Sequence, residues 1–329
     1  MRALVTGVAG FIGSHLAEQL LAEGHSVRGI DCFTPYYDPA AKRANVEGLG
    51  SRTRFELVEA DLRVAELEPL LSSIDTVFHQ SAQPGVRLSW SDGFAQYVEN
   101  NIAVTQRLLE AVRHQPVGRV VYASSSSIYG NAAAYPSTET DVPRPHSPYG
   151  VTKLAAEHLC GLYGANWGVP TVALRYFTVY GPRQRPDMAT YRLIEAALGP
   201  DEGSDGPAQA FPLYGDGTQV RDFTYVGDVV AANLAAARAH VAAGTVINVA
   251  GGSSCTLAQL VDLVGGLVGR DVPLGRRPAQ PGDVARTGGS IDRAADLLGW
   301  KPQVDLRAGV ARQVEWHVGR RAASGRARA

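Results

Sequence analysis

The chain has 329 residues, 45% of them hydrophobic, which is enough for a large buried core and for two domains. Its formal net charge is −1, so it carries no excess of basic residues that would attract nucleic acid or an anionic membrane surface. We therefore expect neither partner, and any phosphate group must be bound by local features.

The cysteines and the first residues favour a cytoplasmic protein. Cys32, Cys160 and Cys255 are far apart and lack the spacing of metal ligands or of a disulfide framework, so we expect no metal site. No apolar run reaches the roughly 20 residues of a membrane helix. The chain opens on a strand pattern rather than on a cleavable leader.

Short β-branched runs alternate with helix-period stretches through the first half of the chain. The predicted strands are Arg2–Thr6, Ser26–Asp31, Arg54–Glu59, Thr76–His79, Arg119–Ala123 and Thr171–Arg175. The clearest predicted helix is Phe94–Val112, whose apolar residues form one stripe. This alternation predicts an α/β fold, a Rossmann-type doubly wound parallel sheet.

The regular alternation ends after Arg175. A loop rich in Pro, Arg and Gly, Gly181–Asp187, precedes shorter elements with turn signals at 199–207 and 278–289, which we interpret as a smaller second lobe. The last residues have no apolar periodicity, and we expect a disordered basic tail over 318–329.

Three glycines follow the first predicted strand at three-residue spacing and lead into an amphipathic helix. In a dinucleotide site, Gly7 would permit the tight turn, Gly10 would let a pyrophosphate approach the backbone, and Gly13 would let the helix pack on the strand. The helix N-terminus would add N–H groups and a favourable dipole. The alternative is an ordinary turn.

Asp31 ends the second predicted strand, where a carboxylate can accept both hydroxyls of an adenosine ribose. It would repel a 2′-phosphate, so NAD is favoured over NADP. Asp61 and Leu62 follow the third strand and are placed to border the adenine. The alternative is that Asp31 is a surface charge.

A second motif resembles the start of a helix. Ser147 is the predicted N-cap and Pro148 the first helical residue, so Tyr149 lies in the first turn and Lys153 follows at i+4 on the same face. A phenol with a reference pKa of about 10 becomes a usable proton acceptor when an ammonium and a positive nicotinamide ring favour its phenolate. A surface Tyr/Lys pair is the alternative.

A run of serines, Ser124–Ser127, ends the strand predicted at Arg119–Ala123. Ligands of open parallel sheets bind beyond the carboxyl ends of the strands, so a hydroxyl there can polarise a substrate carbonyl. A flexible turn is the alternative reading of the four serines.

Together the glycine motif, the serine run before Ile128-Tyr129-Gly130, and Tyr149-x-x-x-Lys153 resemble the extended short-chain dehydrogenase/reductase family of sugar-nucleotide enzymes. The resemblance implies an NAD-binding Rossmann domain at 1–176 plus about 222–249, and a nucleotide-sugar lobe at 177–221 and 250–317. It also implies a homodimer joined through helices near 91–114 and 148–167. Further implied cofactor contacts are Phe11, Ile12, Gln80, Ala82 and Tyr176, although Gln80-Ser81-Ala82 departs from the usual Leu-Ala-Ala.

By this resemblance, Ser125 takes the position of the catalytic hydroxyl. Tyr149 would take the proton of the substrate's 4-hydroxyl while hydride passes to NAD, and Lys153 would bind the nicotinamide ribose and tune the tyrosine. Family dehydratases and decarboxylases carry an acid where Ser126 and Ser127 stand here. Without that acid a transient 4-keto intermediate can only take the hydride back on its other face, which predicts an epimerase.

Four stretches resemble UDP-glucuronate 4-epimerases in particular: Asp31–Arg43, Gln83–Arg87, Phe177–Met188 and Gln280–Asp283. The implied substrate is a UDP-hexuronic acid, with UDP-glucuronic and UDP-galacturonic acid interconverted. Thr178 stands where neutral-hexose epimerases commonly have Asn. Ser125, Ser126, Ser127 and Thr178 could hold the carboxylate out of line with the ketone, which would prevent its loss as carbon dioxide. Arg87 is a possible charged partner of the carboxylate or a structural ion-pair residue.

For the UDP end, the resemblance points to Arg185, Arg192 and Arg221 near the diphosphate and to Asp283 on the uridine ribose, since the guanidinium fork suits phosphate. Each arginine could instead be a surface residue. The rival functions are a UDP-glucose or UDP-N-acetylglucosamine 4-epimerase, a UDP-glucuronate decarboxylase, and a non-catalytic NAD-binding sensor.

Overall fold

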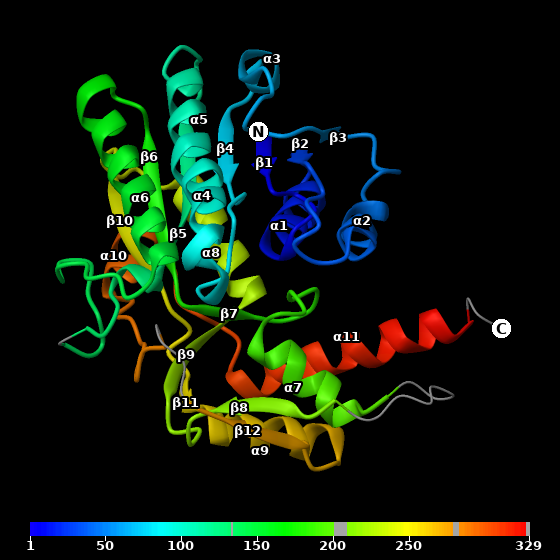
Figure 1. Ribbon diagram of the computed structural model, residues 1–329. Coiled ribbons are helices and arrows are strands. Elements are labelled where there is room, and N and C mark those ends of the chain that lie inside the picture. The colour runs from blue at the N-terminus through cyan, green and yellow to red at the C-terminus, as the bar shows by residue number, and fades with distance from the viewer. Residues whose placement is uncertain (133, 201–208, 279–282, 327–329) are drawn as a thin grey trace.

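In the computed structural model, residues 1–132, 134–200, 209–278 and 283–326 are described. The centre of the fold is a parallel sheet of seven strands in the order β10-β6-β5-β4-β1-β2-β3 (Figure 1). Its strands are β1 (Arg2–Thr6), β2 (Ser26–Asp31), β3 (Phe55–Glu59), β4 (Thr76–His79), β5 (Arg119–Ser125), β6 (Thr171–Tyr176) and β10 (Thr245–Val249). The order reverses next to β1, as expected for a doubly wound fold. The predicted α/β Rossmann-type fold is therefore confirmed.

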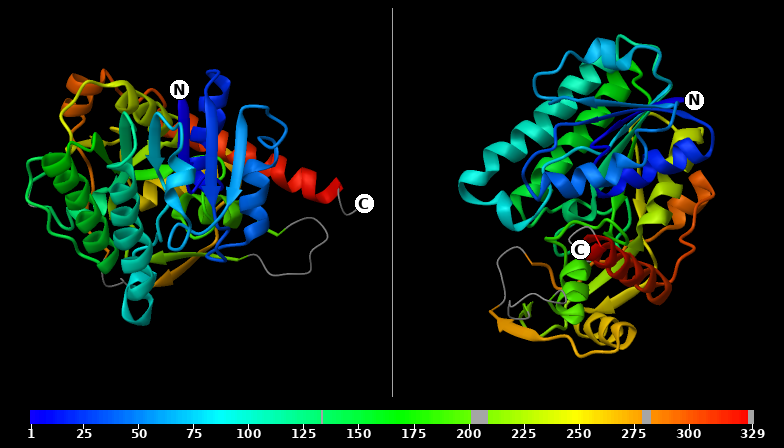
Figure 2. Two further views of the ribbon diagram at one scale, coloured as in Figure 1. Left: turned by 90° about the horizontal axis from the view of Figure 1, so that it is seen from above. Right: turned by 90° about the vertical axis from the view of Figure 1, so that its right-hand side faces the viewer.

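Helices cover both faces of this sheet (Figure 2). One face packs on α1 (Phe11–Ala22), α2 (Pro39–Glu47), α8 (Val226–Arg238) and α10 (Asp292–Leu298). The other face packs on α3 (Leu67–Leu71), α5 (Val104–Val112) and α6 (Pro148–Trp167). The central strands β4 and β6 are buried along their whole length, as expected for strands covered on both faces, whereas the edge strand β3 is largely exposed.

The predicted helix Phe94–Val112 is divided by a π-helical turn. It consists of α4 (Phe94–Tyr97), the π-helical turn η3 (Val98–Ala103) and α5. Asn101 in this turn bonds through its side-chain amide to Gln83 O and Thr152 Oγ1. A π-turn often marks a functional position in a helix, and here it brings α4 against the loop after β4 and against α6.

Short 3-10 turns are η1 (Arg87–Ser89), η2 (Ser91–Gly93) and η4 (Ser126–Ile128).

The remaining elements gather at one end of the large sheet, below it in Figure 1. A three-stranded sheet has the order β11-β9-β7, and a two-stranded sheet pairs β12 with β8. These elements are β7 (Thr178–Tyr180), α7 (Ala189–Leu198), β8 (Phe211–Tyr214), β9 (Val220–Tyr225), β11 (Ser254–Thr256), α9 (Leu257–Val268), β12 (Leu274–Arg277) and α11 (Leu306–Arg326). They enclose their own apolar cluster, which includes Leu193, Phe223 and Leu260.

The prediction of a disordered tail from 318 is wrong for the part that the structure describes. Helix α11 continues to Arg326, and only 327–329 lie outside the described residues. Arg321 pairs with Glu195 of α7 at 2.5 Å and donates to Gly199 O, while Arg320 also contacts Glu195. The arginines that resembled a solvated tail instead hold the last helix against α7. Among all described residues, no helix is both long and apolar enough to cross a membrane.

Candidate active site

The glycine motif forms a tight turn between β1 and α1. Gly7 has a φ of +68°, which a residue with a side chain rarely adopts. A Cβ added at Gly13 would lie 2.1 Å from Gly7 O, and one at Gly10 would lie 3.1 Å from the same oxygen. Any side chain at Gly13 would therefore push α1 off the strand, and the loop leaves the helix N-terminus open.

Asp31 is held rigidly at the carboxyl end of β2. Its two carboxylate oxygens accept hydrogen bonds from Ala9 N at 3.1 Å and from Phe33 N at 2.8 Å. Because Ala9 belongs to the glycine turn, the carboxylate is locked in place beside it. Such a fixed acceptor next to a glycine turn suits an adenosine ribose.

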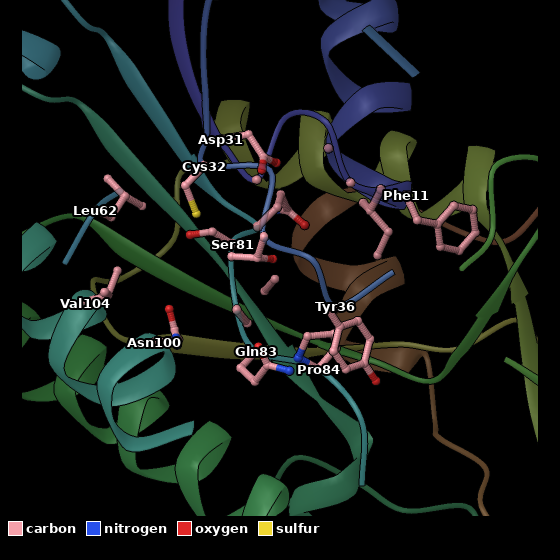
Figure 3. A pocket seen from close by; sticks show the side chains of 18 of the residues that line it. Phe11, Asp31, Cys32, Tyr36, Leu62, Ser81, Gln83, Pro84, Asn100 and Val104 are labelled. Atoms are coloured by element: carbon pink, nitrogen blue, oxygen red, sulfur yellow. The ribbon is translucent and has the colours of Figure 1, made fainter. Parts of the chain in front are cut away.

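All of the predicted cofactor residues line one pocket at the carboxyl ends of the strands, part of which Figure 3 shows. They are Gly7, Gly10, Phe11, Ile12, Gly13, Asp31, Asp61, Leu62, Gln80, Ala82, Tyr149, Lys153 and Tyr176. Sequence reasoning missed other lining residues, among them Cys32, Tyr36, Lys42, Gln83 and Asn100. The stretch Asp31–Arg43 was noticed only as a whole, so it pointed to this wall of the pocket without assigning its side chains.

Helix α6 begins as predicted. The Ser147 hydroxyl accepts from Gly150 N at 3.1 Å, and Pro148 occupies the first turn. Tyr149 and Lys153 both face the pocket. The ring of Tyr97 from α4 meets that of Tyr149 edge to face, with centroids 6.2 Å apart, which limits where the phenol can lie.

Burial shifts the pKa values of Tyr149 and Lys153 in one direction, and neighbouring charges and hydrogen bonds shift them in the other. Burial raises the pKa of the Tyr149 phenol, whereas a hydrogen bond from Ser125 and the positive charge of Arg185 lower it. Burial lowers the pKa of the Lys153 ammonium to about 7, although Cys160 and Glu157 oppose that shift. Burial thus disfavours the charged form of both side chains, and a neighbouring opposite charge favours it.

Hydroxyl groups collect where β5 and β6 end. The strands pair as far as Ser125 opposite Tyr176, so Ser126 and Ser127 continue from one strand and Thr178 from its neighbour. The three residues are partly buried. A Cβ on Gly150 would lie 2.6 Å from Ser127 O, so the serine run packs directly on the first turn of α6.

Arg185 also lines the pocket, beside Tyr149. Its guanidinium donates to both carboxylate oxygens of Asp187, at 2.9 and 3.0 Å, and Tyr36 donates to the same carboxylate at 3.2 Å. The sequence predicted Arg185 near a diphosphate but did not reveal this carboxylate partner.

The other residues predicted at the UDP end, Arg192, Arg221 and Asp283, divide into two places. Arg87, predicted as a partner of the substrate carboxylate, pairs with Asp283 at 3.5 Å and stacks on the Tyr214 ring at 4.1 Å. Burial lowers the pKa of the Arg221 guanidinium, and the Asp283 carboxylate opposes this shift. Arg192 lies elsewhere, in a separate hollow between α7 and β8. Of the stretch Gln280–Asp283, only Asp283 lies within the described residues.

The pocket combines a turn built for a dinucleotide, a fixed carboxylate for its ribose, the partly buried Tyr149 and the buried Lys153. These features define a nucleotide-dependent enzyme that oxidises or reduces a carbon bearing oxygen. Residues 3–250 match the model of the NAD dependent epimerase/dehydratase family, and the chain belongs to this family.

The chain is similar along nearly its whole length to several known proteins. It is 40% identical to an uncharacterized UDP-glucose epimerase, YtcB, of Bacillus subtilis over 96% of this chain and 98% of that one. It is 36% identical to a probable UDP-glucuronate 4-epimerase of Rhizobium meliloti, over 96% and 97% of the two chains. The crystal structure of UDP-glucuronic acid 4-epimerase from Bacillus cereus with UDP-glucuronic acid and NAD superposes with a TM-score of 0.91, at 40% identity over 97% and 99% of the chains.

Proposed function

We propose that this protein is an NAD-dependent 4-epimerase that interconverts UDP-glucuronic acid and UDP-galacturonic acid. The observation that carries the proposal is that Tyr149 and Lys153 line the pocket that the glycine turn and Asp31 also form, with Ser125 in hydrogen-bond contact with Tyr149. The similarity to the Bacillus cereus enzyme, which was crystallised with UDP-glucuronic acid and NAD, supports it.

The residues present fit NAD. The turn at Gly7, Gly10 and Gly13 leaves no room for side chains, and the Asp31 carboxylate is fixed at the adenosine end. Gln80, Ala82 and Tyr176 would complete the walls of the cofactor site. When bound, NAD supplies the hydride acceptor and donor for carbon 4 of the sugar.

Tyr149 then acts as the acid and base. Its phenolate accepts the proton of the 4-hydroxyl as carbon 4 is oxidised, and the phenol returns the proton when the ketone is reduced on the opposite face. Ser125 donates a hydrogen bond to the substrate oxygen, and Lys153 stabilises the phenolate electrostatically. Among the described lining residues, the carboxylates are Asp31, the last residue of β2, and Asp61, which follows β3. Both belong to the part of the pocket proposed for adenosine. The lack of a lining acid beside Tyr149 favours epimerisation over elimination.

The enzyme must control the orientation of the substrate carboxylate, and neutral hydrogen-bonding groups can do so. A 4-keto uronate loses carbon dioxide easily when its carboxylate bond is parallel to the π orbitals of the ketone. Ser126 and Ser127 follow the end of β5, and Thr178 begins β7 just beyond the end of β6. There their hydroxyls would hold the carboxylate out of that alignment. These three hydroxyls are the feature that favours a uronate substrate over a neutral hexose.

The smaller lobe, 177–221 and 250–317, would grip the nucleotide, while 1–176 and about 222–249 would bind NAD. The ion pair of Arg87 with Asp283, close to Arg221, supports a uridine and diphosphate site at this place. Arg185 would reach the substrate next to Tyr149, whereas Arg192 lies in the separate hollow between α7 and β8 and is no part of this proposal.

We also propose a homodimer joined through the helices near 91–114 and 148–167. Large apolar side chains are exposed along them, for example Phe94, Val98, Val151, Leu162 and Trp167. Light scattering coupled to gel filtration distinguishes a dimer from a monomer of 34.9 kDa.

The three free cysteines are in keeping with the reducing cytoplasm as the site of action.

The similarity to YtcB makes a UDP-glucose 4-epimerase the second candidate. To separate the two, the purified protein is incubated with UDP-glucuronate, UDP-glucose and UDP-N-acetylglucosamine in parallel, and the sugars are identified by proton NMR. UDP-galacturonate from the first substrate alone supports the proposal. Product from a neutral sugar alone contradicts the uronate assignment, and a UDP-pentose indicates a decarboxylase.

A further inference from the structure

Lys42 is a buried cation on the wall of the cofactor pocket. The chain has 31 basic residues, and lysine occurs only at positions 42, 153 and 301. Lys301 is exposed and Lys153 belongs to the catalytic pair. Lys42, in the first turns of α2, is 7% exposed and lines the same pocket as Asp31 and the glycine turn.

The ammonium of Lys42 has few partners in the protein. Its Nζ donates to Thr34 Oγ1 at 3.0 Å and lies 4.9 Å from the centre of the Tyr37 ring. Within the described parts of the chain, no carboxylate forms an ion pair with it, so up to two N–H donors have no protein acceptor. Burial lowers the pKa of this lysine, and the nearby Asp31 carboxylate opposes the shift. A buried cation without a carboxylate partner is costly unless a ligand supplies negative charge.

Helix α2 holds Lys42 next to the glycine turn. Asn45, one turn further along the same face, donates through its amide to Ala9 O at 2.9 Å, and Ala9 N donates to Asp31 at 3.1 Å. The peptide of Ala9 is therefore clamped between α2 and β2. This clamp fixes α2, and with it Lys42, against the glycine turn and Asp31, which the proposed function assigns to the adenosine half of the cofactor.

The charges of the pocket require such a cation. Asp31 and Asp61 are negative, and the diphosphate of NAD adds further negative charge. Arg185 already has a carboxylate partner, Asp187, through two hydrogen bonds. Lys153 lies on α6, at the opposite wall from α2.

We propose that Lys42 binds the adenosine-side phosphate of NAD and so retains the cofactor, an inference that rests on the NAD part of the proposed function. Asp31 binds the ribose hydroxyls, the N-terminus of α1 binds the diphosphate backbone, and Lys42 adds one charge-assisted hydrogen bond from the side. Retention matters because an epimerase must return the hydride from the same cofactor molecule that received it.

The test measures cofactor binding, not turnover. Lys42→Met, Lys42→Arg and the control Lys301→Met are saturated with NAD, freed of unbound cofactor, and the released NAD is followed by chromatography. One charge-assisted hydrogen bond corresponds to a roughly tenfold or greater change. We expect that increase in release rate for Lys42→Met, little change for Lys42→Arg, and none for Lys301→Met. Circular dichroism checks folding, and Lys42→Gln replaces Lys42→Met if the latter is unfolded.

Fragments identify the group that Lys42 contacts. ADP and adenosine compete with NAD for rebinding to wild type and Lys42→Met, and the variant should lose affinity for ADP but keep its affinity for adenosine. Equal loss for both fragments, or unchanged NAD release from Lys42→Met, would overturn the inference. A wild-type protein that binds no NAD would instead contradict the proposed function itself.

Discussion

Glu157 and Arg175 form an ion pair in which each side chain is only 4% exposed, with contacts of 2.6 and 3.0 Å. Glu157 lies one turn after Lys153 on α6, and Arg175 lies on β6. The same carboxylate accepts a hydrogen bond from Ser124 Oγ at 2.7 Å. One buried pair therefore ties α6, which carries Tyr149 and Lys153, to β6 and to β5, which ends at Ser125.

Glu157→Gln should destabilise the protein by about 3 kcal/mol, because it leaves the Arg175 charge buried without its partner. Urea unfolding measures the change. The matched control is Glu56→Gln, which removes a surface pair between Glu56 and Arg28 at 2.7 Å and should have no measurable effect. Equal stability of the two variants would mean that the buried pair does not hold the helix and strands together.

Tyr149→Phe should reduce epimerisation by about 10³-fold, because the substrate proton then has no acceptor. NAD and UDP-glucuronate should still bind, as measured by calorimetry. Tyr163→Phe is a control on the same helix, since the hydroxyl of Tyr163 bonds to Glu110 outside the pocket. A Tyr149→Phe variant with substantial activity would assign the acid/base role to another group.

Ser127→Ala and Thr178→Val should release a UDP-pentose from UDP-glucuronate, because the carboxylate can then rotate into line with the ketone. The ratio of pentose to UDP-galacturonate, measured by proton NMR in one reaction, should increase over that of the wild type. Slower epimerisation with no pentose would indicate that these hydroxyls bind substrate without controlling the direction of its carboxylate.

Glu195 joins α7 to α11 and should stabilise the protein in a pH-dependent way. Although burial acts in the opposite direction, hydrogen bonds from His317 and Arg321 lower the pKa of Glu195 from 4.5 to about 2. The folded state thus binds fewer protons than the unfolded state between these values, so the stabilisation is present above pH 4.5 and is lost as the pH falls towards 2.

At pH 7, Glu195→Gln should lower the free energy of unfolding by about 2 kcal/mol, and the difference from wild type should shrink at pH 3. Urea unfolding at the two pH values measures it. A difference that is the same at both would show that the charge of Glu195 contributes nothing and that only its shape matters.

The predicted parts of the site were those that depend on local spacing. The glycine turn, Asp31 at a strand end, and Tyr149 four residues before Lys153 lie within single βαβ units, where periodicity alone brings side chains together. The residues that were missed depend on distant contacts. Arg175 meets Glu157 from another element, and Arg320 and Arg321 become helical because they reach Glu195 far back in the chain. No local pattern specifies such pairs.

Lys42 illustrates the same limit. Its rarity among so many arginines was visible in the sequence, but its position in the pocket depends on how α2 packs on the glycine turn through Asn45 and Ala9. The sequence could indicate that Asp31–Arg43 matters, whereas only the fold shows which of its side chains face the pocket.

The most direct test of the proposed reaction uses UDP-glucuronate carrying deuterium at carbon 4, incubated with the purified, NAD-saturated protein in ordinary water. The proposal predicts UDP-galacturonate that retains the deuterium at carbon 4, because the hydride leaves and returns within one active site. Loss of the label to water, a UDP-pentose as the main product, or no product at all would contradict it.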